Sequence, residues 1–176
     1  AVSLNDMEVR LKLLGGFNAA NAAAAYAVGL SQGLEPAAIK AGLEQVKSLA
    51  GKMEVVRAGQ NFTFIVDYSF EPRALEKLYE AISVIPHGRL IHILGSTGGG
   101  RDRSRRPLLG RMAAERADIV IITNEDPYDE DPAQIINQVS AGAEMSGKVI
   151  NDNLFKILDR REAIKKAVDL APEGDL

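Results

Sequence analysis

The sequence predicts an α/β fold, a mostly parallel sheet with helices on both faces, preceded by a small helical segment and a β-hairpin. Two observations support this prediction. From Phe62 onward, short apolar runs alternate with segments in which apolar residues recur at helical spacing. One of these runs, Ile119 to Ile122, is uniformly apolar, which is typical of a strand that helices cover on both sides.

The beginning of the chain predicts helices. Residues 18–32 are rich in alanine, which loses almost no side-chain entropy in a helix. A second helix is expected from Pro36, because proline is tolerated in the first turn and Ile39 and Leu43 recur on one face. Gly51 then ends the pattern. This part of the chain is therefore expected to be a helical appendage.

The remainder alternates strands and helices. Met53–Arg57 and Phe62–Val66 flank a turn-prone tetrapeptide, which predicts a β-hairpin. The second strand also opens the alternating series, so Asp67 is expected at the carboxyl end of a central parallel strand. The elements expected next are a helix at 72–85, a strand at 89–94, a helix at 105–116, a strand at 118–123, a helix at 132–143, a strand at 155–158 and a helix at 160–170. Residues 174–176 are expected to lead into another strand, as in a fragment of a longer chain.

Composition excludes several classes of protein. A chain of 176 residues, 46% of them hydrophobic, can bury one medium core and an accessory segment. The absence of cysteine excludes disulfides and thiolate chemistry, and it suits a reducing cytoplasm. A net charge of −3 gives no general attraction to nucleic acid. No apolar run approaches the roughly 20 residues of a membrane span, so we expect a cytoplasmic protein without a membrane partner.

Three polar loops each follow a predicted strand, at residues 67–72, 95–103 and 124–132. Ligands of open α/β sheets bind beyond the carboxyl ends of the strands, where loops converge and helix amino termini point free N–H groups outward. If the strands are neighbours, the loops line one cleft of mixed charge. Such a cleft suits a zwitterionic or anionic small molecule.

Each loop also has a simpler interpretation. Asp67 could cap the helix that follows it. The glycines of 95–100 could form a flexible connection, although they also permit close backbone approach to an anion; they lack the order of a Walker loop. The acidic run 125–131 could be a solvated surface loop, and its spacing does not match a calcium-binding EF-hand.

A locally basic stretch contains arginines 101, 103, 105 and 106. Guanidinium groups bind phosphates, but no aromatic residues are interleaved and the chain is acidic overall, so a ligand carboxylate or phosphate is a better target than nucleic acid. His87 and His92 stand alone and are expected to be structural. No catalytic residue and no metal ligand can be assigned. The sequence thus predicts a binding platform rather than a covalent catalyst.

Five motifs, taken in order, resemble those of the Mur ligases. They are Gly15–Ala22, Gly51–Glu54, Val66–Pro72, the glycine loop with Arg101–Pro107, and Thr123–Pro132. Each motif by itself is weak evidence for the resemblance, but the five motifs in this order are specific for the family, and together they cover residues 15–132. Within the family, the pattern is nearest to that of the tripeptide synthetases.

The resemblance implies a domain division and a reaction. Residues 1–51 match the tail of the family's central ATP-binding domain, and residues 52–176 match its Rossmann-like carboxy-terminal domain, truncated at the end. The implied enzyme is an ATP- and Mg²⁺-dependent amide ligase of peptidoglycan synthesis. It phosphorylates the terminal carboxylate of a UDP-linked muropeptide, and the amine of an incoming amino acid attacks the acyl phosphate.

The resemblance also implies a nucleotide site. Asn18 and Asn21 match asparagines near the adenine. Lys52 matches an arginine that contacts the nucleotide, and Asp67 matches an aspartate that holds the ribose. The exchange of arginine for lysine at residue 52 is not conservative wherever a bidentate contact is needed. Most of the ATP and Mg²⁺ contacts are implied to come from a domain absent from this chain.

An amino-acid site is implied at Arg101, Glu125, Asp126 and Tyr128. Arg101 matches the arginine that grips the incoming amino acid, and Glu125 and Asp126 match an acidic pair beside it. Tyr128 replaces the arginine that binds the far carboxylate of meso-diaminopimelate. A phenol carries no charge, so that substrate is expected to be poor and lysine to be favoured beside the acidic loop.

Other departures leave alternatives open. Phe70 replaces the family's usual histidine, which together with Tyr128 keeps a non-catalytic binding module as one alternative. Related ligases, of the folylpolyglutamate or cyanophycin synthetase type, are another. The family's phosphate-binding loop, carbamylated lysine and UDP-sugar domain are not found in these residues. The chain alone is therefore expected to be inactive.

Overall fold

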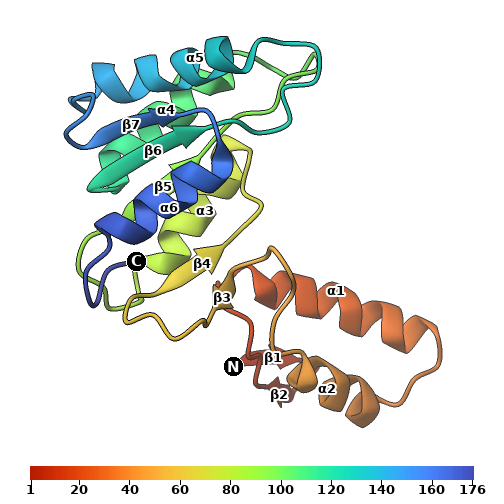
Figure 1. Cartoon of the computed structure of the whole chain (residues 1–176). Helices are drawn as coiled ribbons and strands as arrows, with labels where there is room; N and C mark the ends of the chain where they lie inside the picture. The colour runs from red at the N-terminus through yellow and green to blue at the C-terminus, as the bar shows by residue number, and fades with distance from the viewer.

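The computed structural model describes all residues, 1–176, and shows a parallel sheet between helices (Figure 1). The strands β5 (Ile91–Leu94), β6 (Ile119–Thr123) and β7 (Leu154–Ile157) pair in that order. Both pairings are parallel, with Ile121 opposite Ile93 on one side and opposite Phe155 on the other. The predicted α/β class, with helices on both faces of a parallel sheet, is confirmed.

Helices cover both faces of this sheet because β6 sends alternate side chains to two cores. Val120 and Ile122 join the larger core, which has 15 buried residues, and Ile119 and Ile121 pack against Ala163 on the other face. The helices are α3 (Pro72–Ile82), α4 (Arg105–Arg116) and α5 (Pro132–Met145) on the first face, and α6 (Arg160–Leu170) on the second. All four were predicted, with ends that differ by three residues at most.

The helix starts follow from the local sequence. Proline opens α3 and α5, where its missing N–H would have no partner in the helix. The carboxylate of Asp131 accepts a hydrogen bond from Ala133 N at 3.0 Å, and the carboxylate of Asp159 accepts from two backbone N–H groups of α6. These caps fix where the two helices begin.

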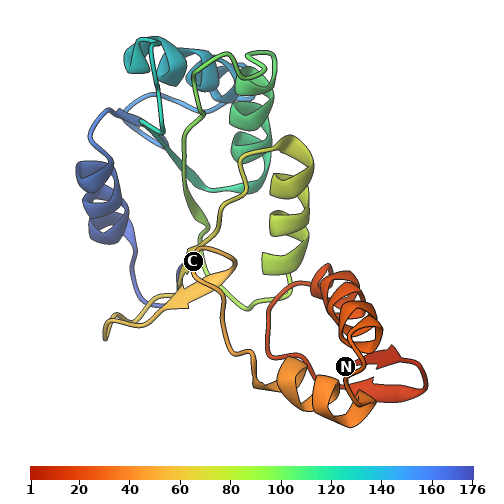
Figure 2. The same ribbon diagram turned by 90° about the vertical axis from the view of Figure 1, so that its right-hand side faces the viewer.

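The first part of the chain forms a separate unit with its own core (Figures 1 and 2). Its helices are α1 (Asn18–Ser31) and α2 (Pro36–Gln45), as predicted. It also contains an antiparallel hairpin, β1 (Val2–Leu4) and β2 (Met7–Val9). The expectation of a purely helical appendage is therefore wrong, because Leu4 and Val9 of the hairpin complete the core under the helices.

A second hairpin links the unit to the sheet. Its strands β3 (Glu54–Val56) and β4 (Phe64–Val66) pair antiparallel, which confirms the predicted hairpin. However, β4 is not hydrogen bonded to β5, because residues 174–176 lie between them. Asp67 therefore follows a strand of a two-stranded hairpin, and its expected place on a central parallel strand is wrong. None of the helices is both long and apolar enough to span a membrane.

Candidate functional site

A cleft of about 520 Å³ lies at the carboxyl edge of the sheet. Its walls come from the loop after β4, the ends of β5 and β6, and the start of α6. The lining residues are Asp67–Phe70, Leu78, His92–Gly95, Asn124–Pro127 and Arg160. Only five of these 14 residues are hydrophobic, so the cleft suits a polar ligand. Two of the three predicted loops form its walls, whereas the glycine loop contributes only Gly95.

Asp67 lies at one end of the cleft with both carboxylate oxygens engaged. Its Oδ2 accepts a hydrogen bond from Met53 N at 2.7 Å, and its Oδ1 accepts from the hydroxyl of Ser69. The N-cap residue of α3 is Glu71 and the helix has no side-chain cap, so Asp67 does not cap that helix. The ammonium of Lys52 lies 5.0 Å from the centre of the Tyr68 ring. The structure thus brings Lys52 and Asp67 to the same end of the cleft.

The acidic wall of the cleft contains Glu125 and Asp126. Burial raises the pKa of Glu125, and the nearby positive charge of Arg160 partly opposes this shift. Arg160 also supports the loop, since its Nε and Nη2 donate to the carbonyl of Asn124 at 3.0 and 2.7 Å. Asp126 and Tyr128 both have positive φ, 28° and 51°, so the loop turns sharply here.

The glycine loop packs against this acidic loop rather than forming an open cradle. A Cβ on Gly98 would lie 2.2 Å from the carbonyl oxygen of Pro127, and one on Gly99 would lie 2.8 Å from the Tyr128 ring. Gly98 N also donates to Asp126 O at 3.0 Å. Gly98 and Gly99 thus allow close contact with the acidic loop, whereas a Cβ on Gly100 would meet no atom within 4 Å, and the approach of this loop to an anion stays a prediction.

A buried ion pair fastens the two loops together. The guanidinium of Arg106, whose side chain is 1% exposed, donates to both carboxylate oxygens of Glu130 at 3.0 Å. It also donates to Gln138 Oε1 at 2.7 Å and Thr97 O at 3.2 Å. The hydrogen bond from Arg106 lowers the pKa of Glu130, and the positive charge of Arg103 adds to the effect. We call this arrangement the Arg106–Glu130 clamp.

The other arginines of the basic stretch have mixed roles. Arg105 is buried, forms an ion pair with Glu71, and lies 5.6 Å from the centre of the Phe70 ring. Arg103 pairs with Glu130 at 3.2 Å. Arg101 alone makes no ion pair and no side-chain hydrogen bond. Three of the four arginines therefore hold the protein together, and only Arg101 can bind a ligand carboxylate freely.

Some predicted site residues lie outside the cleft. Asn18 donates to Leu14 O at 2.6 Å and accepts from Asn21 Nδ2 at 3.0 Å, both within the first unit. Arg101 and Tyr128 are not among the lining residues, and Tyr128 is 71% exposed. The cleft therefore unites Asp67, Glu125 and Asp126 of the predicted residues, with Lys52 at its edge.

Two features of the cleft were missed by sequence reasoning. Arg160 lines it, and its position at the start of a helix beyond a strand was the available signal. Asn124 Oδ1 is buried without a hydrogen-bond partner. His92 also lines the cleft; its Nδ1 lies 2.7 Å from the hydroxyl of Tyr79, and burial lowers its pKa to about 4, so its expected structural role stays a prediction. No three acidic, histidine or cysteine side chains gather into a cluster that could hold a metal ion.

Comparison with known proteins gives consistent matches. Residues 51–176 match the family described as Mur ligase, glutamate ligase domain. The chain is 43% identical over 169 residues to the UDP-N-acetylmuramyl-tripeptide synthetase of Roseiflexus sp., covering 96% of this chain and 33% of that protein. It is 40% identical over 172 residues to the UDP-N-acetylmuramoyl-L-alanyl-D-glutamate–2,6-diaminopimelate ligase of Syntrophomonas wolfei, covering 98% and 34%.

The solved structures agree. One described as a UDP-N-acetylmuramoyl-L-alanyl-D-glutamate–2,6-diaminopimelate ligase matches with a TM-score of 0.64 and 34% identity, over 95% of this chain and 33% of that one. The chain therefore spans about a third of the length of the curated relatives it matches.

Proposed function

This chain belongs to the Mur ligase family, and from that premise we propose that it orients the incoming amino acid in an ATP-dependent ligase that extends a UDP-linked muramoyl peptide. The observation that carries the proposal is the polar cleft at the carboxyl edge of β5 and β6, with Glu125 and Asp126 in its wall. Two relatives at 40% identity or more have names that describe this kind of addition.

We propose the same domain division that the sequence predicts, with residues 1–51 as the tail of an ATP-binding domain and 52–176 as the amino-acid domain. The separate core of the first unit and the start of the family match at residue 51 support it. Lys52 and Asp67 lie close to this boundary and are proposed to contact the nucleotide, with Asn18 and Asn21 contributing from α1.

The reaction needs groups beyond this chain. When bound, ATP and Mg²⁺ supply the phosphoryl group and neutralise its charge. The chain's own residues bind and orient: Asp67 retains acceptor capacity for a ribose hydroxyl, since each carboxylate oxygen has a second lone pair. Carboxylates in the cleft wall attract the ammonium groups of an amino acid, and Arg101, which lies on the glycine loop outside the cleft lining, is proposed to bind its carboxylate. Holding the amine beside the acyl phosphate is a catalytic contribution in itself.

The amino acid is proposed to be lysine rather than meso-diaminopimelate. The two differ in a far carboxylate, and the neutral, exposed Tyr128 offers that carboxylate no charge. Three carboxylates line the cleft; Asp67 is proposed to hold the ribose, so Glu125 and Asp126 are the two left to contact the amino acid, while Glu130 is held in the clamp and Asp131 caps α5. These two carboxylates therefore account for the proposed preference for a cation.

A chimera tests the proposal. Residues 1–176 replace the matching third of the Roseiflexus tripeptide synthetase, and ATP-dependent formation of the UDP-muramoyl tripeptide is followed by mass spectrometry. We expect tripeptide from the chimera and none from the isolated chain. Asp126→Ala should raise the KM for the amino acid at least tenfold and leave the KM for ATP unchanged, since one charge-assisted contact is worth on the order of 2 kcal/mol.

The matched substitution Asp129→Ala changes a carboxylate of the same loop that does not line the cleft, so its KM for the amino acid should stay within twofold. A folded chimera that binds ATP but extends the peptide with no amino acid would contradict the proposal and favour the non-catalytic module.

A further inference from the structure

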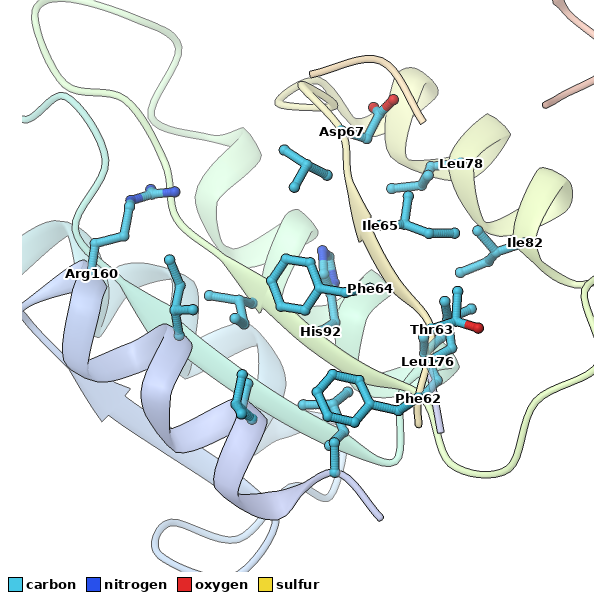
Figure 3. A pocket seen from close by; sticks show the side chains of 18 residues that line it. Phe62, Thr63, Phe64, Ile65, Asp67, Leu78, Ile82, His92, Arg160 and Leu176 are labelled. Atoms are coloured by element: carbon cyan, nitrogen blue, oxygen red, sulfur yellow. The ribbon is translucent and has the colours of Figure 1, made fainter. Parts of the chain in front are cut away.

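Arg160 is the only arginine or lysine that lines the polar cleft. It also lines a second cavity, of about 230 Å³, in which 14 of the 18 lining residues are hydrophobic. Figure 3 shows the Arg160 side chain extending from the first turn of α6, at the end of this cavity that lies opposite Phe62. The side chain thus borders both cavities, and the proposed function gives it no role.

The start of α6 fixes the backbone of Arg160. At the N-cap, Asp159 Oδ1 accepts hydrogen bonds from two backbone N–H groups of the first turn, at 2.8 and 3.0 Å. The helix then packs against β6 through Ala163, which is fully buried. Because these contacts hold the helix start against the sheet, the Arg160 side chain extends from a fixed point.

The guanidinium of Arg160 binds a backbone oxygen that lies 36 residues away along the chain. Its Nε and Nη2 donate to Asn124 O at 3.0 and 2.7 Å. Asn124 is the first residue after β6, so this oxygen lies at the base of the acidic loop. Arg160 makes no ion pair. Its contact is therefore a forked one with the loop backbone and not with a carboxylate.

The two bonds from Arg160 are the only hydrogen bonds between α6 and the acidic loop. On its other side the loop is held by the Arg106–Glu130 clamp and by Gly98 N, which donates to Asp126 O at 3.0 Å. Between these contacts Asp126 and Tyr128 have positive φ, which costs free energy in a residue other than glycine. Such a loop keeps its shape only while its surroundings hold it, so loss of the α6 contact should release it there.

The charge state of Glu125 reports on this contact. Burial raises the pKa of Glu125, and the positive charge of Arg160 opposes the shift. Release of the loop would remove the burial and lower the pKa, whereas loss of the charge alone would raise it further. The other groups around this carboxylate are Asp126 of the same loop, Arg105 of α4, the hydroxyl of Thr97 in the glycine loop, and Asp67 and His92 in the cleft.

We propose that Arg160 is a positioning residue for amino-acid binding. Its forked contact with Asn124 O holds the acidic loop so that the carboxylates of Glu125 and Asp126 stay in the cleft wall. The inference rests on the proposed function, in which these carboxylates bind the ammonium groups of the amino acid. Lysine cannot replace the fork, because all donors of an ammonium belong to one atom. Arg160 therefore acts on the KM for the amino acid through the loop.

Amide exchange and a carboxylate titration test the positioning in the 176-residue chain. Gly98 N–H reports on the loop because its acceptor is Asp126 O, and Val120 N–H, on the fully buried β6, reports on global unfolding. In Arg160→Ala, the increase in exchange rate at Gly98 should be at least tenfold larger than the increase at Val120. The pKa of Glu125, followed by NMR, should fall toward its ordinary value as burial is lost.

Two matched variants locate the effect. Arg160→Lys keeps the positive charge without the fork, and it should resemble Arg160→Ala in exchange at Gly98. Arg161→Ala removes the neighbouring arginine, whose side chain makes no hydrogen bond and no ion pair, and it should leave exchange at Gly98 unchanged. Unchanged exchange at Gly98 in Arg160→Ala would overturn the proposal. So would full restoration by lysine or a rise in the pKa of Glu125, because the arginine would then act through its charge alone.

The chimera with the Roseiflexus synthetase tests the effect on the reaction. Arg160→Ala should raise the KM for the amino acid at least tenfold and leave the KM for ATP within twofold. A variant that is merely less stable would lose kcat at an unchanged KM. If Asp126→Ala raises the KM for the amino acid and Arg160→Ala does not, the positioning role alone is wrong. If neither raises it, the proposed function is wrong.

Discussion

Two regions of the fold differ in how closely their strands and helices pack. The region around β6 is fully packed, and we call it the closed side; the region between β4 and β5 is not, and we call it the open side. One repeating strand–helix pattern builds both. On the closed side, β6 is fully buried and α4 and α5 are so close that Gly110 and Gly142 leave no room for a Cβ. On the open side, β4 and β5 do not pair, and a mostly apolar cavity of about 230 Å³ lies between them. The difference shows that an apolar pattern predicts a strand but does not determine which strand lies beside it.

Gly142→Ala should have the largest effect on the closed side. The added Cβ would lie 1.8 Å from the carbonyl oxygen of Pro107, a backbone atom that can move only if α4 moves. We expect a loss of about 4 kcal/mol or more in the free energy of unfolding, measured by urea denaturation. Gly42→Ala in α2 is the matched substitution, because no atom lies within 4 Å of its Cβ. It should stabilise by up to about 1 kcal/mol. Similar effects of the two would mean that α4 and α5 are not closely packed.

Arg106→Ala should have the next largest effect. It removes the clamp and leaves Glu130 beside Arg103 alone, which we expect to cost about 3 kcal/mol in the free energy of unfolding. The loops should also become more sensitive to proteolysis. Arg101→Ala, at an arginine without an ion pair, should change stability by no more than about 0.5 kcal/mol. An equal loss in both variants would show that the clamp is not the contact that joins the loops.

His92 should make stability depend on pH. Burial holds its pKa at about 4 in the folded chain, against 6.5 for an exposed histidine. Between these values the unfolded chain binds a proton that the folded chain does not, so stability falls as the pH falls. From pH 7 to pH 5 the loss should be about 2 kcal/mol, measured by thermal denaturation. His92→Gln should flatten this dependence, whereas His87→Gln should retain it; the same slope in all three proteins would contradict the assignment.

Much of the fold could be predicted because its local signals are strong. Apolar spacing located α4 and α6 to the residue, and proline marked the start of α5. The first hairpin was missed because its strands have three residues each, although Asn5 and Asp6, both with positive φ, form the kind of two-residue turn that favours a hairpin.

The site was harder to predict. Sequence placed Asp67, Glu125 and Asp126 at strand ends, and the cleft unites them. It could not separate a ligand-binding arginine from a structural one, because the role of Arg106 depends on its ion pair with Glu130, which lies 24 residues away along the chain. The partner of β4 is likewise set by tertiary contacts and not by its own apolar residues.

The central claim is that the cleft of this chain selects the amino acid of a Mur-type ligation. The most direct measurement supplies the chimera with equal concentrations of lysine and meso-diaminopimelate and quantifies the two tripeptides by mass spectrometry. We predict at least a tenfold excess of the lysine product, because Glu125 and Asp126 in the cleft wall attract a cation, while Tyr128, on the same loop but outside the cleft lining, gives a far carboxylate no charged partner. An excess of the diaminopimelate product would contradict this account of the cleft.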